Sequence, residues 1–296
     1  MRPIETPFPV LVHPYHSPSR GTCAYEMGIV SSRNAVIFIG GLGDGPHSTP
    51  YIRTVAARLA AATDLSYSVF EIRLRSAFSG FGTSSLMNDV EDIAALVKYL
   101  RSLGRDRIVL FGHSTGCQDC MEYTHYAKHN SPRVDGFILQ APVSDRESLE
   151  VFHPDYQTSL DLASSWIAQG KADDCLPAGM ASNVLGAPVS AYRLHSLWSK
   201  GGDDDYFSTD LDDETVKRVW ARFEKPVLVL HSEKDEFVVE GGPIDQSAQN
   251  KRYRDANPLV SPLSGLIPGT GHTVLQEEAR QWLAVRVEEF LRTLNQ

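Results

Sequence analysis

The stretch GHSTG at residues 112–116 follows an apolar run at residues 107–111 and precedes a helix-like segment at residues 117–123. A Gly-x-Ser-x-Gly pentapeptide between a buried strand and a helix is typical of a nucleophile turn. Such a turn strains the serine backbone, and the flanking glycines remove Cβ atoms that would otherwise collide. The pattern predicts that Ser114 is a catalytic nucleophile rather than part of a merely structural turn.

Further short apolar runs recur along the chain and end in glycine or polar turns. They lie at residues 35–39, 68–74, 136–140, 226–231 and, more weakly, 264–267. Amphipathic, helix-like segments alternate with them at residues 51–62, 87–103, 115–128 and 277–294. Near-continuous apolar strands that alternate with helices are typical of a parallel sheet covered on both faces. The sequence therefore predicts an α/β fold with a mostly parallel, doubly wound sheet, to which residues 23–30 add antiparallel edge strands.

Residues 145–220 interrupt this alternation with scattered aromatic residues and glycine-bearing turns. A structureless loop of this length is uncommon in a compact domain. We therefore expect a mostly helical cap over one end of the sheet. On this interpretation residues 1–296 form a single domain that contains the cap as an insertion.

The composition excludes several classes of protein. The net charge of -9 argues against a nucleic-acid surface, and no stretch approaches the ~18 apolar residues of a membrane span. No secretory signal is expected at the N-terminus. Four cysteines make no disulfide framework, which favours a reducing, cytoplasmic compartment. Cys117 and Cys120 form a C-x-x-C pair, but no second ligand pair lies nearby, so we expect packing and no metal or other cofactor.

A serine nucleophile needs a base, and the base needs a group that orients it. In α/β folds with this turn the chain order is serine, then acid, then histidine. Asp235 follows the run at residues 226–231 by a few positions, with Glu233 and Glu236 as rivals. His272 lies in a glycine-rich loop between the last strand and the final helix. We therefore predict a triad of Ser114, Asp235 and His272.

Two other histidines lie close to these motifs. His113 lies inside the pentapeptide, and we expect its side chain to pack away from the nucleophile. His231 ends a buried strand, where we expect a hydrogen-bonded core residue. An acidic stretch at residues 203–214 lacks the spacing of an EF-hand. A solvated turn and a helix start explain this stretch better than calcium or a cationic substrate.

An oxyanion hole requires backbone amides near the nucleophile. We expect one from Thr115 and the other from Leu42, in the glycine-rich loop at residues 39–45. This loop does not match the dinucleotide-binding pattern. Five residues are candidate substrate contacts, four after strand ends and one in the cap: Gly41, Asp44, Arg75, Ser79 and Trp198. For Arg75 a structural ion pair is at least as good an explanation.

Three motifs, at residues 38–45, 79–86 and 112–119, together resemble a fungal and plant family formerly of unknown function. Its best understood members are fungal siderophore esterases of the fusarinine C hydrolase type. The resemblance implies the α/β-hydrolase fold and a cytosolic enzyme that opens ester bonds in fusarinine-type hydroxamate siderophores to release iron. It implies the same triad, Ser114, Asp235 and His272, and no metal cofactor, because any iron arrives with the substrate.

Two alternatives remain open at this point. One is a broad carboxylesterase or lipase-like hydrolase, which would share the triad but not the substrate. The other is a non-catalytic binding protein on a hydrolase scaffold. Such proteins usually lack a triad member, whereas all three residue types are present here. The partner that we expect is a small-molecule ester, with no nucleic acid and no membrane, and the oligomeric state is open.

Overall fold

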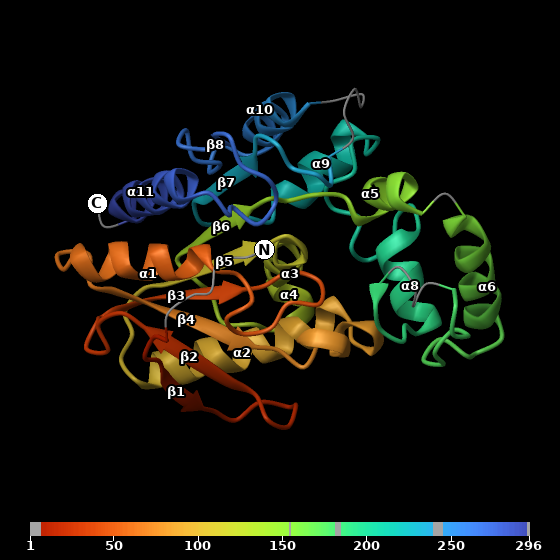
Figure 1. The fold of residues 1–296 in the computed structure, drawn as a ribbon, viewed down its shortest axis with the longest axis horizontal. Coiled ribbons are helices and arrows are strands. Elements are labelled where there is room, and N and C mark those ends of the chain that lie inside the picture. Colours follow the sequence, from red (N-terminus) through yellow and green to blue (C-terminus); the bar gives the residue numbers. More distant parts are fainter. Residues whose placement is uncertain (1–6, 154, 181–184, 239–244, 295–296) are drawn as a thin grey trace.

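The computed structural model describes residues 7–153, 155–180, 185–238 and 245–294. Within these residues eight strands form one sheet in the order β1-β2-β4-β3-β5-β6-β7-β8 (Figure 1). The pairs β1–β2 and β2–β4 are antiparallel, and the other neighbours are parallel, which confirms the predicted architecture. The strands are β1 (Leu11–Pro14), β2 (Cys23–Met27), β3 (Asn34–Ile39), β4 (Tyr67–Arg73), β5 (Ile108–His113), β6 (Gly136–Gln140), β7 (Val227–Ser232) and β8 (Gly265–Ile267).

The apolar runs form the central strands, and they are apolar throughout because helices cover both faces of the sheet. Every residue of β3, β5, β6 and β7 is buried, as expected for strands without a solvent-facing side. The edge strand β1 was not predicted. Only His13 is buried there, and the strand ends at Pro14, so it has no apolar pattern to read.

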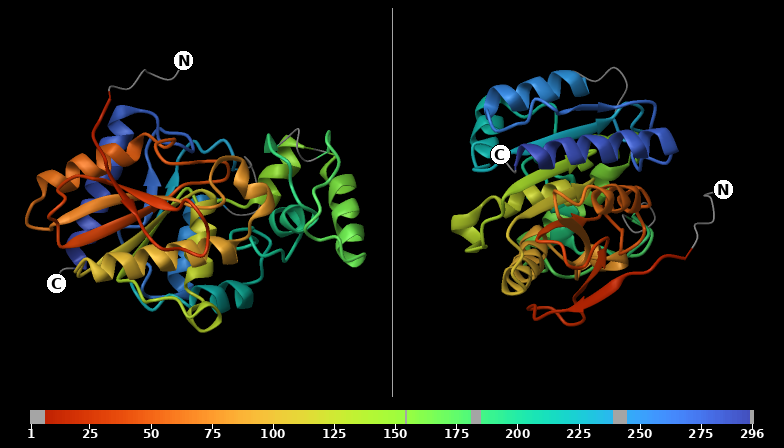
Figure 2. Two further views of the ribbon diagram at one scale, coloured as in Figure 1. Left: turned by 90° about the horizontal axis from the view of Figure 1, so that it is seen from below. Right: turned by 90° about the vertical axis from the view of Figure 1, so that its left-hand side faces the viewer.

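Two layers of helices enclose the sheet (Figures 1 and 2). Helices α1 (Tyr51–Ala61) and α11 (Glu277–Thr293) pack on one face, in one hydrophobic cluster with alternate side chains of the strands. The opposite cluster contains side chains of α2 (Leu86–Ser102), α3 (Thr115–Tyr123), α9 (Asp213–Trp220) and α10 (Gln246–Ala256). None of the described helices is both long enough and apolar enough to cross a membrane.

Two helical boundaries differ from the prediction. The segment expected at residues 115–128 breaks after Tyr123, and a separate short helix, α4 (Tyr126–His129), follows. Helix α10 was not predicted, because two of its three buried residues, Gln249 and Asn250, are polar and leave no apolar stripe. Its third buried residue, Tyr253, stacks on Trp220 with ring centroids 4.0 Å apart.

A third group of helices lies beyond the sheet, at the right of Figure 1: α5 (Asp145–Phe152), α6 (Tyr156–Ala168) and α8 (Ala191–Trp198). They form a hydrophobic cluster of their own, which includes Ala163, Leu194 and Trp198. We refer to α5, α6 and α8 as the helical unit. Helix α9 also falls within residues 145–220, but its Trp220 packs in the main core.

Candidate active site

The nucleophile turn connects β5 directly to α3. Ser114 has φ 52° and ψ -123°, a backbone conformation that side-chain-bearing residues rarely adopt. A Cβ atom on Gly112 would lie 2.2 Å from the Gly116 carbonyl oxygen, and one on Gly116 would lie 2.3 Å from the Ile39 carbonyl oxygen. Only glycine fits at these two positions, so the chain can turn sharply enough to present Ser114 at the end of the sheet.

The acid and the base meet at the carboxyl ends of β7 and β8. The Nδ1 atom of His272 lies 2.8 Å from Oδ2 and 3.0 Å from Oδ1 of Asp235. Both side chains are buried. A carboxylate at Nδ1 makes that nitrogen the N–H donor, so Nε2 carries the lone pair that can accept a proton. This dyad can therefore act as an oriented general base.

The two rival acids hold the histidine loop in place. Glu236 Oε2 accepts a hydrogen bond from the backbone amide of His272 at 2.8 Å, and Glu233 Oε2 accepts one from the Gly269 amide at 2.6 Å. Of the three carboxylates in this turn, Asp235 is thus the one on the imidazole. The other two fix the backbone that carries it.

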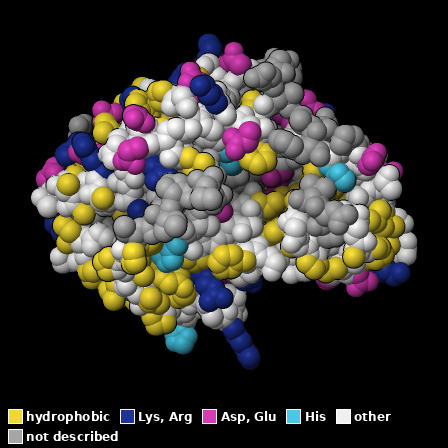
Figure 3. All heavy atoms as spheres, viewed as in Figure 1, with side chains coloured by type: hydrophobic (Ala, Val, Ile, Leu, Met, Phe, Trp, Pro, Cys, Tyr) yellow, Lys and Arg dark blue, Asp and Glu magenta, His cyan; other side chains and the backbone are white. Residues whose placement is uncertain are grey.

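Ser114 and His272 line the same cavity, which has a volume of about 520 Å³. We call it the active-site cavity. Among the described residues no hydrogen bond joins the Ser114 hydroxyl to the His272 imidazole, and such bonds often shorten only when substrate binds. The space-filling view is hollowed between the sheet and the helical unit, and hydrophobic side chains are visible at this hollow (Figure 3). Apolar side chains from both sides line the active-site cavity: Leu42, Phe81, Val143, Leu149, Leu185, Trp198 and Phe237.

The two amides expected for an oxyanion hole are available. Thr115 is the first residue of α3, where an amide has no intrahelical acceptor. Neither its amide nor that of Leu42 donates to another described residue. Asp44 shapes the loop that carries Leu42, because its Oδ2 accepts from the Gly41 amide at 2.9 Å. A Cβ atom on Gly41 would lie 2.7 Å from the Cβ of Ser114, so this loop approaches the nucleophile closely.

His113 is buried and packed, as expected, but its side chain also belongs to the site. Its ring lines the active-site cavity, with a centroid 5.0 Å from that of His272. Its Nδ1 donates to Gln140 Oε1 at 2.6 Å, since an amide oxygen can only accept. Burial lowers the pKa of His113 to about 4, which keeps the ring neutral. Gln140 in turn donates from Nε2 to the His272 carbonyl at 3.3 Å. A glutamine at the end of the apolar strand β6 was the sequence signal for this link.

The candidate substrate contacts divide into two groups. Gly41, Asp44 and Trp198 line the active-site cavity. Arg75 and Ser79 are not among its lining residues. Arg75 pairs with Asp92 at 2.8 Å and with Glu91 at 3.1 Å, so the ion-pair alternative describes it. Ser79 is exposed in a 3₁₀ helix, η1 (Phe78–Thr83). Of the apolar residues that line the cavity, Leu42 and Trp198 were predicted, and the others were missed because nothing in their local sequence separates them from ordinary core residues: Phe81, Val143, Leu149, Leu185 and Phe237.

Other expectations about polar residues met mixed outcomes. His231 is buried, and within the described part of the chain neither ring nitrogen has a hydrogen-bond partner, so the expected hydrogen bond is wrong. Burial lowers the pKa of His231 to about 4. Asp212 caps α9 by accepting from the Thr215 amide at 2.6 Å, which confirms the helix start. Asp204 is not solvated as expected, since it is buried 2.6 Å from Arg193.

The cysteines carry no cross-link. All four are free, and Cys117 and Cys120 are fully buried. Burial raises the pKa of both thiols well above the ordinary value, which keeps them protonated. The Cys117 thiol donates to the Gln140 carbonyl at 3.3 Å, behind the nucleophile turn. In the described part of the chain no cluster of three or more His, Cys, Asp or Glu side chains is arranged to hold a metal ion.

Comparison with known proteins shows which chains this one is similar to. A family model described as "Protein of unknown function (DUF1749)" matches residues 1–292. A Schizosaccharomyces pombe protein, UPF0613 protein PB24D3.06c, is 32% identical over 88% of this chain and 88% of its own length. The fusarinine C esterase sidJ of Aspergillus fumigatus is 29% identical over 97% of this chain and 96% of its own. The solved siderophore hydrolase EstB from Aspergillus fumigatus superimposes with a TM-score of 0.79 at 27% identity, covering 97% of this chain and 98% of its own.

Proposed function

This chain belongs to the family described as "Protein of unknown function (DUF1749)", with the α/β-hydrolase fold, and from that premise we propose that it is a serine esterase. The substrates that we propose are the ester bonds of fusarinine-type hydroxamate siderophores. The observation that carries the proposal is a buried Asp235–His272 dyad whose imidazole lines the same cavity as the strained Ser114. The names of two similar proteins, a fusarinine C esterase and a siderophore hydrolase, support the substrate class.

In the proposed first step, Nε2 of His272 takes the proton of the Ser114 hydroxyl as its oxygen attacks the ester carbonyl carbon. The carbonyl oxygen becomes negatively charged, and the Leu42 and Thr115 amides donate hydrogen bonds to it. Asp235 stabilises the imidazolium. The imidazolium then gives its proton to the leaving alkoxide, so the ester C–O bond breaks and an acyl-enzyme remains.

In the second step, His272 deprotonates a water molecule, whose oxygen attacks the acyl carbon. Collapse of this intermediate returns the proton to Ser114 and releases the carboxylic acid. No cofactor takes part, and iron bound to the siderophore enters and leaves as cargo of the substrate. We propose that this cleavage weakens the chelate and releases iron inside the cell. The helical unit acts as a cap that closes one side of the cavity.

The test incubates the wild type and Ser114→Ala with fusarinine C, in ferric and iron-free forms, and follows the products by mass spectrometry. The wild type is expected to yield linear fragments whose summed mass exceeds that of the intact substrate by one water per bond cleaved. Ser114→Ala is expected to lose at least about 10³-fold in kcat, because the nucleophile is gone while the amides of the oxyanion hole remain.

A fluorophosphonate probe provides the independent readout, since it labels an activated serine without reference to the substrate. We expect it to label Ser114 in the wild type. Undiminished turnover by a folded Ser114→Ala would refute the serine mechanism. A labelled enzyme that cleaves short acyl esters as efficiently as fusarinine C would instead favour the broad carboxylesterase, whose substrates the apolar lining also suits.

A further inference from the structure

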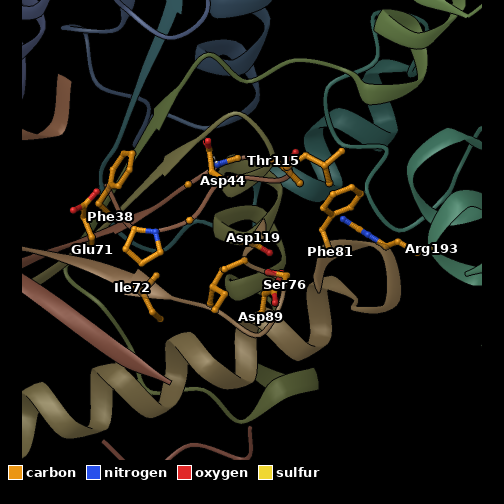
Figure 4. A pocket seen from close by; sticks show the side chains of 17 residues that line it. Phe38, Asp44, Glu71, Ile72, Ser76, Phe81, Asp89, Thr115, Asp119 and Arg193 are labelled. Carbon is orange, nitrogen blue, oxygen red and sulfur yellow. Dashed lines mark hydrogen bonds between the residues drawn. The ribbon is translucent and has the colours of Figure 1, made fainter. Parts of the chain in front are cut away.

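A second, smaller cavity adjoins the oxyanion-hole residues (Figure 4). It shares Leu42, Phe81 and Thr115 with the active-site cavity, but neither Ser114 nor His272 lines it. It offers about 30 Å³ to water-sized groups. A single water molecule needs about 10–15 Å³ by this measure, so the cavity has room for a small polar head group and none for an acyl chain. We call it the acidic cavity, for the side chains described next.

Two carboxylic acids from different helices meet in the acidic cavity. Asp89 comes from α2 and Asp119 from α3, and Figure 4 shows both gathered with Ser76 at one end. Their exposed fractions are 5% and 3%. The described ion pairs include neither residue. Among the described residues Oδ1 of Asp89 accepts a hydrogen bond from the Ser84 hydroxyl at 3.5 Å, and Oδ1 of Asp119 has no hydrogen-bond partner. A buried polar oxygen without a partner is costly, so Asp119 has an acceptor available to a ligand.

An unpaired hydroxyl points to the same place. Oγ1 of Thr115 is buried and has no hydrogen-bond partner among the described residues, and Thr115 lines the acidic cavity. The amide of this same residue is one of the two proposed oxyanion donors. The acidic cavity therefore adjoins the proposed oxyanion hole.

The cations of the protein balance these acids only in part. Arg193 lines the acidic cavity and pairs with Asp204 through Nη1 at 2.6 Å, while its buried Nε has no hydrogen-bond partner among the described residues. Arg75 pairs with Asp92 at 2.8 Å. Burial raises the pKa of Asp89 to about 7 and that of Asp119 well above its usual range, with the charge of Arg193 opposing the rise in both. Burial thus favours the neutral form of both acids, and a cation that entered would favour their ionised form.

We propose that the acidic cavity is a cation subsite that takes an ammonium group carried by the acyl part of the ester, close to the scissile carbonyl. This inference rests on the proposed function and names the class of substrate within it. An ammonium is close to water in size and donates hydrogen bonds in a tetrahedral arrangement. Asp119, Asp89 and the Thr115 hydroxyl supply three acceptors, and the charged pair is stronger than a neutral one.

The preference for an ammonium depends on pH through these acids. As the pH rises through about 7, Asp89 loses its proton more readily and the subsite becomes more attractive to a cation. Other charged groups act on the two acids from the elements packed around them: Arg75 after β4, Asp92 from α2, Glu122 from α3, Arg193 from α8 and Asp204 after it. Asp44 and Glu71 line the rest of the acidic cavity.

The test uses pairs of esters that differ only by an ammonium in place of a methyl group. Alanine methyl ester is compared with methyl isobutyrate, and β-alanine methyl ester with methyl butyrate. Each ratio of kcat/KM is divided by the ratio for hydroxide-catalysed hydrolysis, because an ammonium also activates the ester. We expect the wild type to prefer at least one ammonium ester by about tenfold or more, as for one charge-assisted hydrogen bond.

Asp119→Asn keeps the size of the side chain and removes its charge, so the preference should fall to near one while methyl isobutyrate is still cleaved. Asp89→Asn provides a second variant if Asp119→Asn does not fold. Glu122→Gln is the matched control, since Glu122 is a buried acid on the same helix that is bonded to Lys128 and His129 instead. It should keep the wild-type preference.

The outcomes separate this inference from the proposed function. If the wild type and the variants all cleave both members of each pair equally, the two acids hold only water. This result refutes the cation subsite and leaves the proposed esterase intact. An enzyme that neither cleaves these esters nor reacts with a fluorophosphonate refutes the esterase, and the subsite with it. A preference that survives both asparagine variants also refutes the subsite.

Discussion

The two walls of the active-site cavity are built in different ways. The wall at the sheet consists of turns that follow β3, β5, β7 and β8. A Cβ atom added at Gly41, Gly112 or Gly116 would lie 2.2–2.7 Å from a neighbouring atom, so these positions leave no room for side chains. The opposite wall comes from the helical unit, where Leu149 and Trp198 face the cavity through ordinary hydrophobic packing. The sheet wall is constrained by its backbone, and the helical wall by its side chains.

This difference assigns different roles to the two walls. A wall whose backbone is fixed can hold reacting atoms to the accuracy that catalysis requires. A wall made of packed side chains can change shape by substitution without disturbing the fold. We therefore expect the sheet wall to set the rate for every ester and the helical wall to set which esters bind.

The largest effect is expected at the sheet wall from Asp235→Asn. The amide can donate to Nδ1 and so favour the wrong tautomer of His272, which lowers kcat by about 10³–10⁴-fold for short and long esters alike. Steady-state kinetics on two acyl lengths measure this. Glu233→Gln is the control, because a glutamine oxygen still accepts from the Gly269 amide, and its kcat should stay close to that of the wild type. A fall in kcat for only one acyl length would contradict the division of roles.

Gly41→Ala is expected to have an intermediate effect. Its Cβ atom would overlap the Cβ of Ser114, at 2.7 Å, and displace either the nucleophile or the Leu42 amide. A displacement of about 1 Å costs on the order of 10²-fold in kcat. Gly265→Ala in β8 is the matched control, because nothing lies within 4 Å of its Cβ position. Equal activity of the two variants would show that the loop is not held against the nucleophile.

The smallest effect on rate is expected at the helical wall. Trp198→Leu enlarges the cavity, so KM should change by roughly three- to tenfold between bulky and short acyl esters, while kcat stays within about twofold. Trp220→Leu removes an equally buried indole from the main core, away from the cavity. It should lower the Tm without changing the ester profile. A shared loss of kcat in Trp198→Leu would place this residue in the rate-setting wall instead.

The sequence predicted the sheet wall well, because its constraints are local. Ser114, Asp235 and His272 each follow an apolar strand, and glycines mark the tight turns beside them. The contact between His113 and His272 depends on Gln140, which no local pattern connects to either residue. Leu149 and Phe237 are ordinary apolar residues until packing brings them to the cavity.

The acidic cavity escaped prediction for a related reason. Asp89 and Asp119 lie on two amphipathic helices, and an acid in such a helix is expected on the face exposed to solvent. Only the packing of α2 against α3 makes both of them interior. The polar face of α10 was hidden in the same way, since burial of Gln249 and Asn250 cannot be inferred from an apolar stripe.

The positive φ of Ser114 has a consequence for how this protein can change over generations. A residue other than glycine in that conformation costs about 1–3 kcal/mol, and neighbouring contacts, such as the bond from the Ser114 amide to the Gln140 carbonyl at 3.0 Å, must hold it there. Glycine at this position would relieve the strain and abolish the chemistry together. A homologue that no longer needs to hydrolyse esters could therefore gain thermal stability through the single substitution Ser114→Gly. Higher stability from a substitution at this position would then indicate that esterase activity has been lost.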